Sequence, residues 1–401
     1  MSWLTVVGIG EDGLGGIGAN ARAAIAEAEL VFGGTRHLDL AAAAITGEPR
    51  PWRTPFSDSI DDILAARDRR VCVLGSGDPF YFGVGATLAK HVDPAQMRVI
   101  PHSSSFSLAA AKLGWPLQDV VALSLHGRPI ELIQPHLHPG ARILALTSDE
   151  HGPAAIARLL TEAGFGISIV SVLEALGGSR EKLRNQLAMQ FDLADIDPLN
   201  LCAISVVALP GARILPLTPG LADDLFEHDG QITKRDIRAV TVAALAPRRG
   251  ELLWDIGAGA GSIAIEWMLA DPSCRAIAIE SDPERAARIG RNARSLGVSP
   301  LQVVRGTAPE ALAGLEPPHV IFIGGGGSDE GVLDAAMTAL RPGGRLVANA
   351  VTLELEAMLL ARHAELGGRL TRIAVSHADS IGSMTGWRPA MPVTQWSWSK
   401  P

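Results

Sequence analysis

Residues 251–270 read ELLWDIGAGAGSIAIEWMLA, which places a strand, a glycine-rich turn and a helix in direct succession. The apolar run that ends at Ile256 has the length and composition of a buried parallel strand. Three glycines follow at Gly257, Gly259 and Gly261, and a second apolar segment comes after them. A strand that passes through a glycine turn into a helix is the repeating unit of an α/β fold.

The carboxylate of Asp255, at the end of this strand, limits the kind of ligand that the turn would hold. The dinucleotide fingerprint is G-x-G-x-x-G, whereas the third glycine here comes one residue earlier. A pyrophosphate would be repelled by Asp255, but the ammonium and sulfonium groups of S-adenosylmethionine (SAM) would be attracted by it. Glu280 ends the next strand, where a carboxylate accepts hydrogen bonds from ribose hydroxyls. We therefore predict a SAM site; the alternatives are a dinucleotide site, a purely structural turn, and for Glu280 a solvated strand end.

The rest of the second half repeats the same pattern. Apolar runs in RAIAIESD, LQVVRGTAPEAL, HVIFIGGGGSD and GGRLVANAV predict four more strands. The tail predicts two further strands joined by a loop at 378–388, which is either a lid over the site or a plain surface loop. Five parallel strands followed by an antiparallel pair resemble the class I methyltransferase domain, a doubly wound, Rossmann-like sheet.

This resemblance adds contacts to those predicted from the glycine turn and the two carboxylates. Thr307 and Ala308 lie where the adenine of SAM binds in that family, and Thr233 lies near the start of a predicted helix. The predicted SAM contacts of the second half are Thr233, Asp255, Gly257, Ala258, Gly259, Ala260, Gly261, Glu280, Thr307 and Ala308.

The first half contains a different glycine turn, in VCVLGSGDPFYFGVG at residues 71–85. The turn follows an apolar strand, as phosphate-binding turns do, but it contains Asp78 and no lysine follows it. Other apolar runs of this half also end at polar or glycine turns and lead into helices. This arrangement predicts a second α/β region with a mostly parallel sheet.

Five segments of the first half resemble the class III tetrapyrrole methyltransferases: VVGIGEDG, GSGDPFYFGVG, PHSSSFSLAAAKLGW, SLHGR and LTSDEHGPAAIARLL. The resemblance implies two α/β lobes that bind SAM in the cleft between them. It also implies SAM contacts at Ser76, Gly77, Asp78, Tyr81, Ser104 and Ser105. Many relatives carry G-x-G-P-G in the first loop, whereas here Gly10 is followed by Glu11-Asp12-Gly13. Glu11 has three interpretations: a base, a group facing the substrate pocket, or a helix cap.

The two resemblances divide the chain into a domain at 1–209, a linker at 210–225 and a domain at 226–401. This order of domains resembles the bifunctional precorrin methyltransferases of aerobic cobalamin biosynthesis, over nearly all of the 401 residues. The resemblance implies that the first domain methylates carbon 5 of reduced precorrin-6 (precorrin-6B). It implies that the second methylates carbon 15 and removes carbon dioxide from the ring C acetate, giving precorrin-8. It also implies a homo-oligomer.

Precorrins carry many carboxylates, so we expect cationic side chains around both clefts. Candidates are His102, His126, Arg128, Lys234, Arg235, His377 and Arg388, although each of these is otherwise a solvated surface group. Among these, His126-Gly127-Arg128 is the favoured cationic cluster, because it follows a strand and lies on a glycine turn. The sequence does not identify the catalytic residues; His126, Arg128 and Glu11 are the candidates.

Composition argues against other classes of function. The net charge of −8 disfavours the first alternative, an RNA methyltransferase, because nucleic-acid surfaces need an excess of basic residues. The second alternative, a SAM-binding regulator without catalysis, is disfavoured by two intact SAM turns. Three widely spaced cysteines (Cys72, Cys202 and Cys274) predict reduced thiols in a cytoplasmic protein and no metal site. No apolar run has the length of a membrane span.

Overall fold

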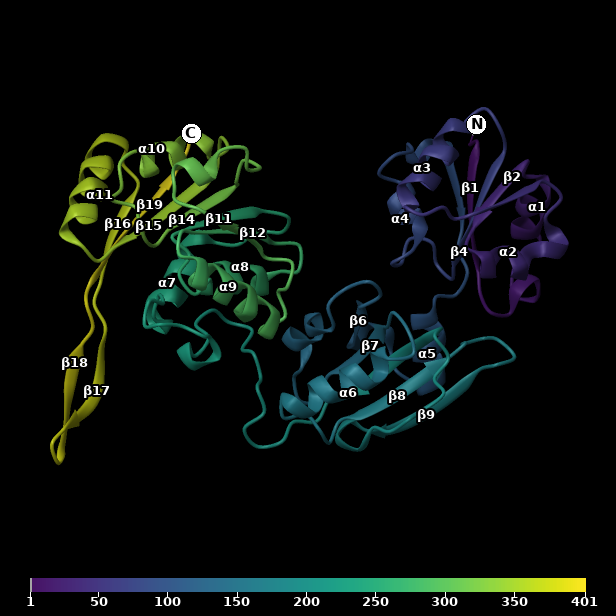
Figure 1. The fold of residues 1–401 in the computed structure, drawn as a ribbon, viewed down its shortest axis with the longest axis horizontal. Helices are drawn as coiled ribbons and strands as arrows, with labels where there is room; N and C mark the ends of the chain where they lie inside the picture. The colour runs from purple at the N-terminus through teal and green to yellow at the C-terminus, as the bar shows by residue number, and fades with distance from the viewer. Residues whose placement is uncertain (1) are drawn as a thin grey trace. The chain divides into compact units, whose positions relative to one another are not determined.

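The computed structural model describes residues 2–401, which divide into two compact units. The first unit contains the residues up to Ile130 together with His136–Arg213, and the second contains Glu131–Pro135 and Ile214–Pro401. Both units are α/β, as predicted, and each is described separately below (Figure 1). No helix within residues 2–401 is both long and apolar enough to cross a bilayer.

The first lobe of the first unit is a parallel sheet of five strands in the order β3-β2-β4-β1-β5. The strands are β1 Leu4–Ile9, β2 Leu30–Gly33, β3 Glu48–Pro51, β4 Val71–Ser76 and β5 Met97–Ile100. The helices are α1 Ala19–Glu27, α2 Thr35–Ala41, α3 Phe56–Ala65 and α4 Val84–Leu88. Along β1, Leu4 and Val6 join one apolar cluster, whereas Val7 and Ile9 join another. Both faces of the sheet are therefore buried, which explains the unbroken apolar runs of its central strands.

The second lobe contains α5 Ser105–Leu113, β6 Val120–Ser124, β7 Arg142–Leu146, α6 Gly152–Glu162, β8 Ile169–Glu174, β9 Lys182–Leu187 and β10 Asn200–Ser205. Its strand order is β6-β7-β10-β8-β9, and only β6 and β7 run parallel. The expectation of a mostly parallel sheet is therefore wrong for this lobe. Strands β8 and β9 follow one another without a crossover helix, and the polar sequence KLRNQL of β9 carries no strand signal.

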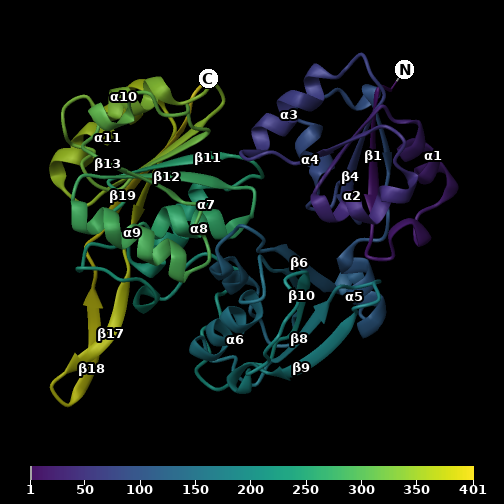
Figure 2. The same cartoon turned by 45° about the vertical axis from the view of Figure 1, so that its right-hand side comes forward.

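The second unit is built on a sheet of seven strands in the order β13-β12-β11-β14-β15-β19-β16. Its strands are β11 Leu252–Ile256, β12 Arg275–Glu280, β13 Gln302–Arg305, β14 Val320–Ile323, β15 Arg345–Ala350, β16 Arg369–Ile373 and β19 Val393–Ser399. Its helices are α7 Arg235–Leu245, α8 Ser262–Ala270, α9 Pro283–Ser295, α10 Val332–Ala339 and α11 Leu353–Leu366. Helices α7, α8 and α9 cover one face and α10 and α11 the other (Figures 1 and 2). The first five strands are parallel and β19 is antiparallel, as predicted.

The segment predicted as a loop at 378–388 is a two-stranded ribbon instead. Strands β17 Ser376–Ile381 and β18 Met384–Pro389 pair only with each other and extend away from the seven-stranded sheet (Figure 1). The sequence SHADSIGSMTGW combines a Gly382 turn with polar residues, so neither strand shows the apolar alternation by which a strand is recognised.

The predicted linker at 210–225 is only partly a connecting segment. From Ile214 onward it belongs to the second unit, and Leu215 and Leu221 are buried in the apolar core beneath α8 and α9. Short 3₁₀ segments occur at Gly13–Gly15, Ala42–Ala44, Pro94–Gln96, Leu117–Asp119, Ile130–His136, Ala188–Gln190, Asp223–Leu225 and Glu310–Leu312.

Candidate active sites

A cavity of about 1010 Å³ lies at the carboxyl ends of β11, β12, β14 and β15, and we call it the C-terminal cavity. This is the edge of a doubly wound sheet at which ligands bind. Eight predicted contacts line it: Thr233, Asp255, Gly257, Ala258, Gly259, Glu280, Thr307 and Ala308. Ala260 and Gly261 do not line it. The carbonyl of Ala260 accepts a hydrogen bond from Asn292 Nδ2 (2.9 Å), and Gly261 caps α8 against Ile289.

The glycine turn of this cavity has a conformation that only glycine adopts without strain. Gly257 has a φ of +69°, and a Cβ atom there would lie 2.3 Å from the carbonyl oxygen of Gly325. Glu280 holds the turn in place, because its Oε2 accepts a hydrogen bond from the Gly259 N–H (2.8 Å) and its Oε1 accepts one from the Asp282 N–H (3.0 Å). Glu280 is buried, so it is not a solvated strand end.

Asp255 is a buried carboxylate that has only half of its hydrogen-bonding capacity satisfied. Its Oδ2 accepts a hydrogen bond from the Ala264 N–H (3.0 Å), whereas the buried Oδ1 has no partner among residues 2–401. Burial raises the pKa of Asp255 to about 7, and the nearby carboxylate of Glu280 contributes to the rise. A buried, unpaired acceptor at a cavity wall suits a cationic ligand group. The site therefore fits the ammonium or sulfonium of SAM.

This pKa predicts how the affinity of the C-terminal site for SAM depends on pH. Because the pKa of Asp255 is raised to about 7, most of this carboxyl group is protonated at about pH 6 and ionised at about pH 8. Only the ionised form attracts a cation, so the affinity is expected to rise by up to about tenfold per unit below pH 7 and to level off above it. Calorimetric titrations across this range would measure the affinity, and a pH-independent value would contradict the assignment.

A buried ion pair that the sequence analysis missed supports the wall of the same cavity. Arg238 on α7 is fully buried, and its Nε donates to Glu266 Oε1 on α8 (2.6 Å). Glu266 also accepts the N–H groups of Gly220 and Leu221 (2.7 and 2.8 Å), and Arg238 Nη1 donates to the Thr233 carbonyl (2.5 Å). The pair thus fixes the segment that carries Thr233. Arg and Glu residues on helices are usually exposed to solvent. The sequence alone therefore does not predict that Arg238 and Glu266 form a buried pair.

The cationic candidates of the second half have different positions. Lys234, Arg235 and His377 line the C-terminal cavity, and His377 Nε2 lies 3.0 Å from Asp236 Oδ2. Arg388 lies on the ribbon, where it pairs with Asp379 (3.0 Å), and does not line the cavity. None of residues 378–388 lines it, which argues against the lid interpretation.

A second cavity, of about 390 Å³, lies between the two lobes of the first unit, and we call it the N-terminal cavity. Five predicted SAM contacts line it: Ser76, Gly77, Tyr81, Ser104 and Ser105. Two of the catalytic candidates, Glu11 and His126, line it as well, and His126 Nδ1 lies 3.3 Å from the Thr147 carbonyl oxygen. Asp78, Arg128 and His102 do not line it, and His102 pairs with Asp12 (3.4 Å).

The turn at Gly77 forms a close-fitting wall of the N-terminal cavity. Gly77 has a φ of +53°, and a Cβ atom there would lie 2.8 Å from Ser104 Cα. Asp78 braces this turn, because its Oδ1 accepts a hydrogen bond from the Phe80 N–H (2.9 Å). Ser104 caps α5 by accepting a hydrogen bond from the Ser107 N–H (3.1 Å). The turn at Gly77 therefore has no room for a side chain at this position, as expected where a small molecule contacts the backbone.

Two further polar residues that line this cavity, Arg36 and His37 on α2, were not among the residues predicted from the sequence. Burial and the neighbouring charge of Arg36 lower the pKa of His37 to about 4, so this imidazole is neutral. Its Nε2 lies 2.8 Å from both Ser76 Oγ and Arg36 Nη2. Arg36 also forms an ion pair with Glu11, which is therefore neither a helix cap nor a solvated group. The pairing joins residues from different loops, which no local pattern encodes.

Known proteins resemble both units. A family model described as tetrapyrrole (corrin/porphyrin) methylases matches residues 3–190, and one described as a precorrin methyltransferase domain matches residues 224–400. The solved C-terminal domain of precorrin-6Y C5,15-methyltransferase from Rhodobacter capsulatus is 49% identical, with a TM-score of 0.44, and covers 46% of this chain and 100% of its own.

Two curated relatives cover nearly the whole chain. A precorrin-6Y C(5,15)-methyltransferase (decarboxylating) from Sinorhizobium sp is 62% identical over 398 residues, 99% of this chain and 96% of the relative. A protein of the same name from Mycobacterium tuberculosis CDC 1551 is 42% identical over 402 residues, 99% of this chain and 100% of the relative. The chain therefore belongs to the precorrin-6Y C(5,15)-methyltransferases (decarboxylating), with a tetrapyrrole methylase domain followed by a precorrin methyltransferase domain.

Proposed function

We propose that this protein methylates reduced precorrin-6 twice, with one active site in each unit. In this proposal the N-terminal cavity serves methylation at carbon 5, and the C-terminal cavity serves methylation at carbon 15 with loss of carbon dioxide from the ring C acetate. The observation that carries the proposal is that each unit has its own cavity lined by a glycine turn, and that the buried Oδ1 of Asp255 lies without a partner at the second cavity. Family membership supports this function over an RNA methyltransferase or a non-catalytic regulator.

SAM, when bound at each glycine turn, supplies an electrophilic methyl group. In the C-terminal cavity, Asp255 holds the cation and Glu280 and Thr233 shape the wall. In the N-terminal cavity, the backbone around Gly77 and Ser104, which caps α5, shape the cavity wall. The residues of each site need mainly to orient the substrate carbon in line with this methyl group and to exclude water. Proximity and orientation greatly lower the activation barrier of methyl transfer.

The C-terminal cavity has more room than a cofactor alone requires. At about 1010 Å³ it is at the upper end of the range for small-molecule sites, so a large substrate fits beside SAM. Lys234 and Arg235 line it and would pair with carboxylates of the substrate. Loss of carbon dioxide from the ring C acetate is helped when that carboxylate is removed from water. Asn349 and Val393 line the cavity and are buried, which supports such desolvation.

Separating the two units tests the division of labour. The C-terminal piece should begin at residue 214, because Leu215 and Leu221 belong to its core and Gly220 binds Glu266. With SAM and reduced precorrin-6, the piece up to residue 213 is expected to add one methyl group without loss of carbon dioxide. The piece from residue 214 is expected to add one methyl group and release carbon dioxide. Mass spectrometry distinguishes the products, and decarboxylation by the N-terminal piece would contradict the proposal.

We further propose a homo-oligomer in the cytoplasm. The three cysteines are free and buried, which supports a reducing compartment. Multi-angle light scattering of the full chain would test the oligomeric state.

A further inference from the structure

Four charged side chains from both lobes of the first unit meet beside the N-terminal cavity. Glu11 follows β1, Arg36 lies on α2, and Arg180 and Asp197 come from the second lobe. Glu11 forms ion pairs with Arg36 and with Arg180 Nη2 (3.6 Å to Oε2), and its side chain is only 11% exposed. An adjoining cavity of about 470 Å³ shares Glu11 and Arg36 with the N-terminal cavity and also has Arg180 in its wall.

Arg36 is held in place by the first lobe independently of Glu11. Its Nη2 donates to Ser76 Oγ (2.9 Å) and to His37 Nε2 (2.8 Å). His37 accepts this hydrogen bond because its pKa is lowered to about 4, so its imidazole carries no charge that would repel the guanidinium. The guanidinium of Arg36 would therefore keep its position if the Glu11 carboxylate moved away.

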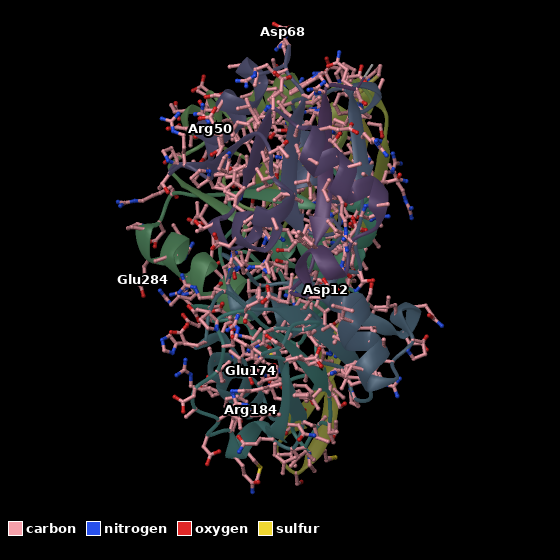
Figure 3. The ribbon with its side chains drawn as sticks, turned by 90° about the vertical axis from the view of Figure 1, so that its right-hand side faces the viewer. Asp12, Arg50, Asp68, Glu174, Arg184 and Glu284 are labelled. Atoms are coloured by element: carbon pink, nitrogen blue, oxygen red, sulfur yellow. The ribbon has the colours of Figure 1, made fainter. Side chains whose placement is uncertain are left out.

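Arg180 is held by a separate network in the second lobe. Its Nη1 pairs with Asp197, and the Asp197 N–H donates to the fully buried Glu174 (2.7 Å). Glu174 is paired in turn with Arg184 on the neighbouring strand (2.9 Å), and Figure 3 labels both of these residues. Each lobe thus presents one anchored guanidinium to the same carboxylate.

We propose that Arg36 and Arg180 form a carboxylate-binding subsite for the substrate of the N-terminal domain, and that Glu11 fills this subsite until a substrate carboxylate displaces it. The proposal rests on the proposed function, which supplies a substrate rich in carboxylates. Guanidinium groups match the planar geometry of a carboxylate and bind it through paired hydrogen bonds. Both arginine side chains are solvent-accessible, 35% for Arg36 and 62% for Arg180, so an incoming carboxylate can reach them.

The exchange is close to neutral in electrostatic energy, because one carboxylate replaces another between the same two cations. Glu11 acts as an intramolecular competitor that keeps the two arginines paired between turnovers. A substrate without a carboxylate at the right place cannot displace it, which gives the site selectivity by competition. Removing the charge of Glu11 is therefore expected to strengthen substrate binding, whereas removing an ordinary structural residue would weaken it.

The test compares Glu11→Gln, Arg36→Gln and Arg180→Gln in the full chain. Methylation without carbon dioxide loss reports the N-terminal site, and carbon dioxide release serves as an internal control. We expect Glu11→Gln to lower KM for N-terminal methylation by roughly three- to tenfold with kcat nearly unchanged. Arg36→Gln is expected to raise KM about tenfold or more, and Arg180→Gln by about threefold because it is more exposed.

A matched control is Glu48→Gln, which makes the same change in charge. Glu48 pairs with Arg50 (2.8 Å) on the edge strand β3, outside both cavities; Arg50 is labelled in Figure 3. Glu48→Gln should leave unchanged the KM for N-terminal methylation and the KM for the reaction that releases carbon dioxide. Uroporphyrin, a stable tetrapyrrole polycarboxylate, provides a binding assay without turnover, and it should bind Glu11→Gln more tightly than the wild type. Its neutral methyl ester should show no difference between the two proteins.

Three results would overturn the proposal. A higher KM for Glu11→Gln would make Glu11 a structural bridge between the lobes. A large loss of kcat at unchanged KM would make it a participant in the chemistry. Equal uroporphyrin affinities for wild type and Glu11→Gln would show that no carboxylate competes with Glu11. If instead the wild type does not methylate reduced precorrin-6 but Glu11→Gln still binds uroporphyrin more tightly, the proposed function fails while the subsite stands.

Discussion

Replacement of Asp255 by asparagine is expected to weaken SAM binding at the C-terminal site by roughly thirty- to five-thousandfold. The substitution keeps the shape of the side chain and the hydrogen bond from the Ala264 N–H. It removes the negative charge of the carboxylate, whose Oδ1 has no other partner to offset the loss. Loss of one partner from a buried charge pair costs about 2–5 kcal/mol. Isothermal titration of the full chain with SAM would measure the two sites, and only the C-terminal one should weaken.

The same variant is expected to be more stable than the wild type above pH 7. The folded-state pKa of Asp255 is raised to about 7, so the folded protein loses stability as pH rises from the ordinary aspartate range to that value. Asparagine has no charge to bury, so the variant's free energy of unfolding should be higher by about 1–3 kcal/mol at pH 8. Urea titration that follows the unfolding of the C-terminal unit would measure this difference in stability.

The matched control for this substitution is Asp282→Asn. Asp282 caps α9 by accepting the N–H groups of Glu284 and Arg285, and it does not line the C-terminal cavity. Asparagine is also a good helix cap, so this control should retain SAM binding and most of its stability. If Asp255→Asn bound SAM as tightly as Asp282→Asn does, the assignment of Asp255 as the cation's partner would be wrong.

Gly77→Ala is expected to lower methylation by the N-terminal domain at least about a hundredfold. The new Cβ atom would lie 2.8 Å from Ser104 Cα and 3.0 Å from the Ser103 carbonyl oxygen, at a backbone φ of +53°. Both neighbours are backbone atoms, so the turn and the start of α5 must shift apart, which deforms the cavity wall. The strain should also cost about 2–4 kcal/mol of stability. Product-resolved mass spectrometry would report the loss.

Two further variants serve as comparisons for Gly77→Ala, one as a control and one at the other site. Gly15→Ala places its Cβ in open space on the same lobe and should leave both activities unchanged. Gly257→Ala, whose Cβ would lie 2.3 Å from the Gly325 carbonyl oxygen, should abolish only methylation at the C-terminal site. If Gly77→Ala and Gly257→Ala each abolished both methylations, the two cavities would not be independent sites.

The elements nearest to the glycine turns were predictable because their signals are local. The strand at 252–256, the turn with Gly257 and the helix after Gly261 follow one another in the sequence, and so do the strand at 71–76 and Gly77. Five parallel strands with an antiparallel partner also followed from the order of apolar runs. The polar strands β9, β17 and β18 escaped prediction, because strands that are exposed do not need apolar residues.

The identity of the contacts within each site was predictable only in part. Asp78 stands in the turn that the resemblance assigned to SAM, yet its carboxylate braces the turn by a bond to Phe80. Arg128 shares a glycine turn with His126, but only His126 lines the N-terminal cavity. A turn determines where the backbone goes, whereas the direction of each side chain depends on the surrounding packing.

The glycine turns, the carboxylate of Asp255 near the end of β11 and the succession of apolar runs were enough to establish two α/β regions and to predict a cation-binding turn in the second. These features depend on residues that are neighbours in the chain, and backbone sterics and the hydrophobic effect act on them directly. The pairing of Glu11 with Arg36 and Arg180, and of Arg238 with Glu266, came from the folded structure alone. Such contacts join segments far apart in sequence, so they arise only when whole lobes and helices pack together.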